Sequence, residues 1–288
     1  MTDSPRPQDA TSRDADPRST GPDAGSSRDV TSRSADSGAA SSPGPSSRDI
    51  GLPDADLPDA DLRDAGLPDA GLPDAGLRDR WHETLLAARA GADGPDPLPY
   101  AENLLARWAE PQRRYHTTAH LAAVLDGIDT LAGHADDVHA VRLAAWFHDA
   151  VYRPDRTENE ERSAALAERA LSEAGVPEAV VAEVARLVRL TVTHDPADGD
   201  RNGEALCDAD LAVLAGGPQE YGAYAARVRE EYGFVPDGAF REGRAAVLRQ
   251  LLDLPRLFRT PHGAAAWEAR ARHNLATELE LLTSSGDG

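Results

Sequence analysis

The chain has one cysteine, no lysine and no long run of apolar side chains among its 288 residues. A single cysteine, Cys207, excludes a disulfide framework and any metal cluster held by several cysteines. Because no run of about 18 apolar residues occurs, we expect no transmembrane helix. The N-terminus also lacks a charged segment followed by an apolar one, so no secretory signal is expected. These absences predict a cytoplasmic protein with no membrane partner.

Acidic residues outnumber basic ones in both parts of the chain. Residues 1–80 contain 9 Arg and 16 Asp, a net charge of -7, and residues 81–288 account for the remaining -13 of the total of -20. Nucleic-acid polymers and anionic membranes attract basic surfaces, so we expect the chain to bind neither. A small phosphorylated ligand is compatible with this charge, because it needs only a local basic pocket.

The first 80 residues have the composition of a low-complexity arm. Residues 1–50 are almost entirely Ser, Asp, Arg, Pro, Gly, Ala and Thr, too few apolar side chains to offset the entropy of folding, which predicts disorder. Residues 51–80 repeat a five-residue unit of the type GLPDA. A pentapeptide-repeat β-helix is the alternative, but six units give little more than one coil, so a linker is favoured. The last residues, 284–288, are predicted to be a disordered tail.

From Arg80 onward the apolar residues recur with the 3.6-residue period of an α-helix, and Pro and Gly lie between the periodic segments. No sustained alternation of the kind typical of strands occurs. The sequence therefore predicts an all-α domain over 81–283. The expected helices lie near 81–90, 98–109, 117–132, 136–152, 158–174, 178–194, 206–215, 218–232, 238–253 and 263–283.

His148 and Asp149 fall on the apolar side of the expected helix 136–152, which is apolar on its other side as well and should be central and buried. A buried carboxylate without a partner costs several kcal/mol, so Asp149 needs a strong one. One interpretation is structural, with an Arg paired to Asp149 and His148 hydrogen-bonded in the core. The other interpretation is a metal site.

Polar residues on other expected helices favour the metal site. His120 and His194 border the apolar arcs of helices 117–132 and 178–194. On helix 206–215, Asp210 lies about 40° from Leu206, whereas Asp208 lies about 200° away and is expected to face solvent or pair with an Arg. Imidazoles and carboxylates together suit a divalent ion such as Mn, Fe, Co or Zn, with Mg also compatible.

The order His120, His148-Asp149 and Asp210 resembles the H…HD…D signature of the HD superfamily of metal-dependent phosphohydrolases. The flanking segments are similar to one bacterial branch of that superfamily, the predicted HD phosphohydrolases. These segments are YHTTAH at 115–120, WFHDAVY at 146–152, NEERSA at 159–164, DADL at 208–211, REEY at 229–232, GR at 243–244 and ARHNL at 271–275. The resemblance covers about 81–283 and implies an HD-type helical bundle.

The resemblance implies hydrolysis of a phosphoester in a small phosphorylated metabolite, for which a nucleotide is the first choice. One divalent ion, Mn, Mg, Co, Ni, Fe or Zn, would be held by His120, His148, Asp149 and Asp210, with Asp208 as the reserve ligand. Asp149 would also orient the attacking water. His194 would bind the phosphate or act as general acid, whereas a solvated or capping histidine would do neither.

Five further residues have both a structural and a functional interpretation. Glu160 follows Thr157 by three residues and precedes an apolar helix, the pattern of a capping box, while the family segment gives it a role in the site. The four arginines that could hold phosphate through charge-assisted bonds, or simply lie on the surface, are Arg114, Arg153, Arg156 and Arg244.

Two other functions are weighed against the phosphohydrolase. HD-type di-iron oxygenases resemble H…HD…H…H…D, but His194 is the only histidine between Asp149 and Asp210, which argues against that activity. A non-catalytic HD protein that binds a nucleotide or another metabolite is the main alternative, because Tyr152 and not Glu stands three residues after Asp149 and leaves the general acid unassigned. The sequence shows no heptad pattern and predicts no oligomeric state.

Overall fold

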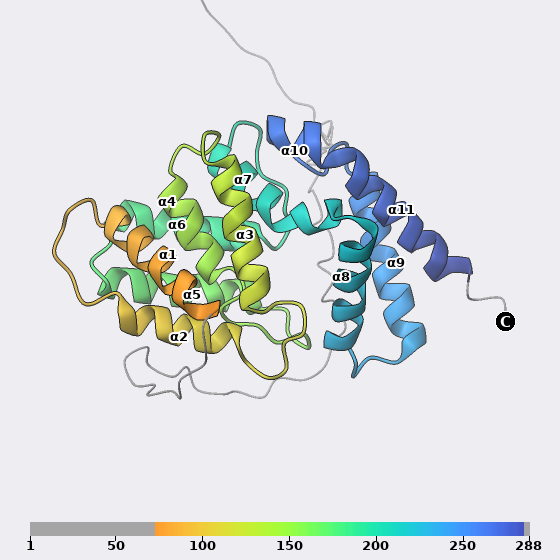
Figure 1. Ribbon diagram of the computed structural model, residues 1–288, viewed down its shortest axis with the longest axis horizontal. Coiled ribbons are helices and arrows are strands. Elements are labelled where there is room, and N and C mark those ends of the chain that lie inside the picture. Colours follow the sequence, from red (N-terminus) through yellow and green to blue (C-terminus); the bar gives the residue numbers. More distant parts are fainter. Residues whose placement is uncertain (1–72, 285–288) are drawn as a thin grey trace, which may run out of the picture. The chain divides into compact units, whose positions relative to one another are not determined.

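The computed structural model describes residues 73–284, and these form helices joined by loops, with no strand among them (Figure 1). The predicted all-α class is therefore confirmed. The predictions of disorder for 1–50 and 285–288, and of a linker for 51–72, fall outside the described residues, whereas Ser284, expected in the tail, is the last residue of α11. The helices are α1 (Pro73–Ala88), α2 (Leu98–Trp108), α3 (Thr118–Leu131), α4 (Val138–Phe147), α5 (Asn159–Glu173), α6 (Glu178–Leu190), α7 (Arg201–Leu211), η1 (Ala212–Ala215), α8 (Pro218–Glu231), α9 (Asp237–Asp253), α10 (Pro261–Ala266) and α11 (Glu268–Ser284).

The first helix begins at Pro73 and not near residue 81, so residues 73–80 of the expected linker belong to the folded domain. Leu77, Trp81 and Leu85 follow one another at four-residue spacing and are 5%, 1% and 0% exposed. This spacing places the three side chains on one face of the helix. The five-residue repeat hides the start of this helix in the sequence, because Leu77 is both the last leucine of the repeat and the first residue of the buried face.

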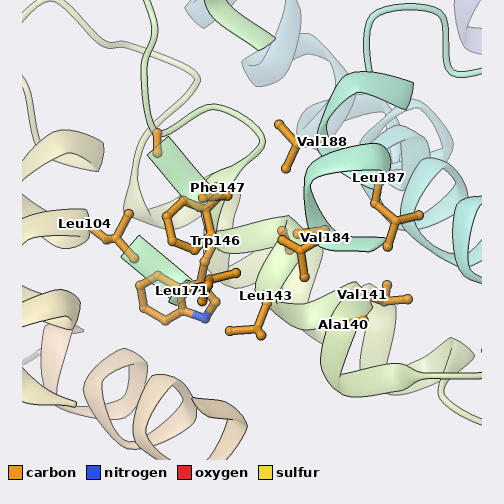
Figure 2. Close-up of a cluster of buried hydrophobic side chains, with 14 of the residues drawn as sticks. Leu104, Ala140, Val141, Leu143, Trp146, Phe147, Leu171, Val184, Leu187 and Val188 are labelled. Atoms are coloured by element: carbon orange, nitrogen blue, oxygen red, sulfur yellow. The ribbon is translucent and has the colours of Figure 1, made fainter. Parts of the chain in front are cut away.

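The main hydrophobic core surrounds α4, as its two-sided apolar pattern predicts. This helix packs against α1, α3, α6 and α7. Asp137 caps its first turn by accepting the backbone N–H groups of His139 and Ala140 at 3.1 and 3.0 Å. Trp146 and Phe147, shown in Figure 2 among their aliphatic neighbours, are fully buried. The last turn of α4 is thereby fixed within the core, and His148 follows it directly.

A second cluster of buried side chains involves η1, α8, α9 and α11. Leu214, Tyr221, Leu248 and Leu275 are among its members, and α11 packs against η1 and α9 (Figure 1). The expected helix 263–283 is divided at Trp267 into α10 and α11. No helix within 73–284 is long and apolar enough to cross a lipid bilayer.

Candidate metal centre

Three predicted ligands come together from three helices. His120 lies in the first turn of α3, His148 is the C-cap residue of α4, and Asp210 lies near the end of α7. One ligand atom from each lies within 4.8 Å of the others. Asp210 Oδ1 is 3.0 Å from His120 Nε2 and 3.6 Å from His148 Nε2. Ligands about 2.1 Å from a metal ion lie about 3 Å apart, so this group could bind a divalent ion.

The ring of His148 has the orientation that a metal ligand requires. Its Nδ1 donates a hydrogen bond of 2.7 Å to the carbonyl of Ala145, and a carbonyl can only accept. The other nitrogen, Nε2, is therefore left for a proton or a metal ion. It is buried and has no hydrogen-bond partner among the described residues. A buried polar atom without a partner is costly, and a bound cation would remove that cost.

Asp149 lies immediately beyond the end of α4, because the helix stops at Phe147 and not near residue 152. Its Oδ2 is 3.4 Å from His148 Nε2 and 3.7 Å from His116 Nε2. Arg113, which is 3% exposed, donates to the Asp149 carbonyl at 2.9 Å and to the His116 carbonyl at 3.1 Å. The buried arginine thus ties together the two backbone segments that carry Asp149 and His116, a role that the sequence did not suggest.

His194 contacts the metal-binding group through Asp210. Helix α6 ends at Leu190, and His194 has a φ of 50°, in the left-handed region, so the expected helix end at 194 is wrong. Its Nε2 is 2.7 Å from Asp210 Oδ2, the oxygen that does not face His120. His194 is thus neither a capping residue nor simply solvated. It holds one carboxylate oxygen of Asp210 while the other faces the two ligand histidines.

The charges of these groups shift their pKa values in opposite directions. Burial raises the pKa of Asp210, but the imidazoles of His148, His120 and His194 outweigh it and hold this pKa well below its usual range. Burial lowers the pKa of His148, but the carboxylates of Asp149 and Asp210 raise it to about 9. The pKa of His120 is lowered, chiefly by burial. In the metal-free chain a proton therefore occupies His148, and a cation would compete with it.

A pocket of about 130 Å³ opens beside these ligands. Its lining consists of Tyr115, His116, His148, Asp149, Glu160, Thr191, His194, Asp210, Leu211, Val213, Leu214 and Tyr224. Glu160 is 4% exposed and lies in the first turn of α5. The predicted capping box is wrong, because the N-cap residue is Glu158 and no side-chain cap bond forms there. Glu160 is instead among the residues that line the pocket, and a role in the site stays a prediction.

Two residues at the site had no role assigned to them from the sequence, His116 and Glu231. The Glu231 side chain is fully buried, and its Oε2 accepts the backbone N–H groups of Arg114, Tyr115 and His116 at 2.8, 3.0 and 3.2 Å. Its Oε1 lies 2.5 Å from His116 Nδ1 and accepts the Tyr152 hydroxyl at 2.7 Å.

The bonds to Glu231 set both its charge state and the orientation of His116. Burial raises the pKa of Glu231, but the bonds from His116, Arg114 and Tyr152 outweigh it and lower the pKa to about 2. The carboxylate fixes the Nδ1 side of the His116 ring, and Nε2 is directed toward Asp149. Helical periodicity gave no signal for His116, because it lies two residues before α3 begins at Thr118.

The arginines predicted to hold phosphate do not line the metal pocket. Arg114 donates to the carbonyls of Pro111 and Arg113, and the exposed Arg153 lies 3.6 Å from Asp155. Arg156 lies in the same loop between α4 and α5. Arg244 lines a neighbouring pocket and forms two hydrogen bonds with Glu278. The structure therefore places none of the four in the lining of this pocket, and their role in phosphate binding stays a prediction.

Asp208, the reserve ligand, has a structural role. The residue is 0% exposed, and it accepts the backbone N–H groups of Arg259 and Thr260 at 2.8 Å each. The prediction that it faces solvent is wrong, because the segment before α10 covers this side of α7. Asp208 therefore joins α7 to that segment, while Asp210 faces the two histidines.

Comparison of the sequence with protein-family models gives no match, and comparison with curated proteins gives none either.

Proposed function

We propose that the chain is an HD-type metal-dependent phosphohydrolase that acts on a small phosphorylated metabolite of the nucleotide class. The observation that carries this proposal is the buried Nε2 of His148, which makes no hydrogen bond and lies beside His120, Asp149 and Asp210 at the edge of a pocket. The proposal is also supported by the H…HD…D order of these residues and by the flanking segments, which are similar to those of the HD superfamily.

His120, His148 and Asp210 would hold the ion, with Asp149 as the fourth ligand. When bound, a divalent ion lowers the pKa of a coordinated water and neutralises charge on a phosphate oxygen. Asp149 lies next to this position and would orient the attacking water and accept its proton. His194 keeps Asp210 in place through a 2.7 Å contact. The chain contributes ligands of the required types at the spacing that a single ion needs.

The dyad of His116 and Glu231 fills the role of general acid that the sequence left open. Glu231 lies 2.5 Å from Nδ1 of His116 and orients the ring, and the opposite nitrogen is directed toward Asp149. His116 would donate a proton from Nε2 to the oxygen of the leaving group as the phosphorus–oxygen bond breaks. The absence of Glu at position 152 is then no obstacle, because the acid comes from the segment before α3.

The test is phosphate release by the full-length chain after its metal has been removed and Mn, Mg, Co, Ni, Fe or Zn added back. The substrates are nucleotides and sugar phosphates. We expect metal-dependent release that His148→Ala and Asp149→Asn abolish, together with a loss of bound metal in His148→Ala measured by elemental analysis. His273→Ala is the matched control, because His273 is exposed on α11.

Metal bound by the wild type without turnover of any substrate would favour a non-catalytic binding protein. Two equivalents of iron per chain would favour the oxygenase. Metal content unchanged by His148→Ala would overturn the proposed centre.

A further inference from the structure

A second pocket lies beside the metal pocket and shares three of its lining residues, Tyr115, His116 and Tyr224. Its other lining residues are Tyr152, Val228, Tyr232, Ala239, Phe240, Gly243, Arg244 and Val247, most of them from α8 and α9. It encloses about 120 Å³. We call it the ring pocket. A molecule whose one end occupies the metal pocket can therefore extend past His116 into the ring pocket.

The walls of the ring pocket are aromatic and aliphatic. The rings of Tyr115 and Tyr224 meet edge to face with centroids 4.8 Å apart, and those of Tyr232 and Phe240 are 6.3 Å apart. Aromatic walls bind another ring well, because offset-stacked and edge-to-face pairs gain more than their buried area alone provides. The side chains of Val228 and Val247 complete an apolar surface for a planar group.

The two basic residues of the lining are already paired within the protein. Arg244 donates to both carboxylate oxygens of Glu278 at 2.8 and 2.9 Å, and to the Tyr224 hydroxyl at 3.2 Å. His116 is bound to Glu231. A charged group placed here would compete with these internal carboxylates, whereas a neutral ring would leave every pair intact.

We propose that the ring pocket binds a single neutral aromatic ring carried by the leaving group of the phosphoester. This inference rests on the proposed function, since the phosphoryl group is placed in the metal pocket. The pocket volume of about 120 Å³ approaches the roughly 150 Å³ of a cavity that accommodates benzene, so the pocket has room for about one ring. The hydrolysed bond joins phosphorus to the leaving oxygen, the oxygen of water replaces it, and His116, which adjoins both pockets, supplies the proton to the leaving oxygen.

Gly243 offers a way to fill the ring pocket with little disturbance of the fold. It lies in the interior of α9, and an added Cβ would meet nothing within 4 Å. Glycine is a poor helix former, so Gly243→Leu should not weaken the helix. Gly238→Leu is the matched control, because Gly238 lies on the same helix with open space around it and outside the lining. Ala239→Leu, at an exposed lining position one turn before Gly243 on the same face of α9, fills the pocket at a second point.

The first measurement is kcat/KM for benzyl phosphate and for ethyl phosphate with the full-length, Mn-loaded chain. Both esters release an alkoxide, so they differ mainly in the ring. We expect the wild type to prefer benzyl phosphate, and Gly243→Leu and Ala239→Leu to lower the benzyl-to-ethyl ratio at least tenfold. Gly238→Leu should keep the wild-type ratio. Hydrolysis of both esters with a ratio that no filling variant changes would overturn the ring pocket and leave the phosphohydrolase proposal standing.

The second measurement needs no turnover. Benzylphosphonate and ethylphosphonate, which cannot be hydrolysed at the phosphorus–carbon bond, are titrated into the Mn-loaded chain by calorimetry. We expect benzylphosphonate to bind at least tenfold more tightly, and Gly243→Leu to remove that advantage. This result without hydrolysis of any ester would support the ring pocket and contradict the proposed activity. Equal affinity for the two phosphonates would overturn the ring pocket.

Discussion

At the scale of single residues, the candidate metal centre depends on which nitrogen or oxygen each side chain leaves available. The carbonyl of Ala145 fixes one nitrogen of His148, His194 holds one oxygen of Asp210, and Glu231 fixes one nitrogen of His116. Each of these contacts leaves the opposite atom directed into the metal pocket. Groups that orient ligands in this way contribute to metal affinity even though they do not touch the ion.

His194→Ala should therefore weaken metal binding without abolishing it. Loss of a group that orients a ligand typically costs 10- to 100-fold in metal affinity, because the ligand must be ordered when the ion binds. We expect this loss in a titration of metal-free chain with Mn or Zn, whereas His148→Ala should remove measurable binding at the same concentrations. Equal losses for the two variants would show that His194 is itself a ligand.

Glu231 should make the stability of the metal-free chain sensitive to acid. Its pKa is lowered to about 2 in the folded chain, so the folded state favours the carboxylate. This contribution is complete above the ordinary pKa of a glutamate and is lost as the pH falls toward 2. A shift of this size corresponds to on the order of 3 kcal/mol.

The measurement is the free energy of unfolding in urea between pH 7 and pH 2. Glu231→Gln should lower stability at pH 7 and flatten its decline with acid. Glu230→Gln is the matched control, because Glu230 is exposed on the same helix. A wild-type slope retained in Glu231→Gln would contradict the assignment of the lowered pKa.

At the scale of elements, the ends of helices decide where the functional residues lie. His148, Asp149 and His194 all lie at or just beyond the last turn of a helix that the periodic pattern extends too far. The pattern does so because the residues beyond the true end, such as Ala150 and Tyr152, are also buried and apolar. Because buried apolar residues continue directly after the helix, the apolar pattern alone does not show where the helix ends.

The start of α1 provides a prediction about stability. Leu77 is 5% exposed in the main core, whereas Leu86 on the same helix is 45% exposed. Leu77→Ala should lower the free energy of unfolding by about 2 kcal/mol or more, because it removes buried methyl groups and leaves a cavity. Leu86→Ala should change it by about 0.5 kcal/mol or less. Chemical denaturation compares the two, and equal small effects would show that α1 contributes little before Trp81.

At the scale of the whole molecule, the described residues begin with helix α1 at Pro73. A truncated variant that begins at residue 73 would retain all of α1. A variant that begins at residue 81 would lose half of the helix, including Leu77. We expect the first to keep the thermal midpoint and metal affinity of the full chain. The second should melt several degrees lower, by the loss of the Leu77 contacts. Calorimetry of the two truncated chains tests this, and a lower midpoint for the first would place part of the stability before residue 73.

The sequence by itself determined the all-α class, the central position of α4 and the candidate ligands His120, His148 and Asp210. These three features can be predicted because the spacing of apolar residues along a helix indicates which of its faces is buried. Only the tertiary structure decided that Glu231 binds His116, 115 residues away, and that Asp208 supports the chain at Thr260, 52 residues away. Those pairs depend on how distant helices pack, and a periodic pattern contains no information about the charge on the neighbouring helix.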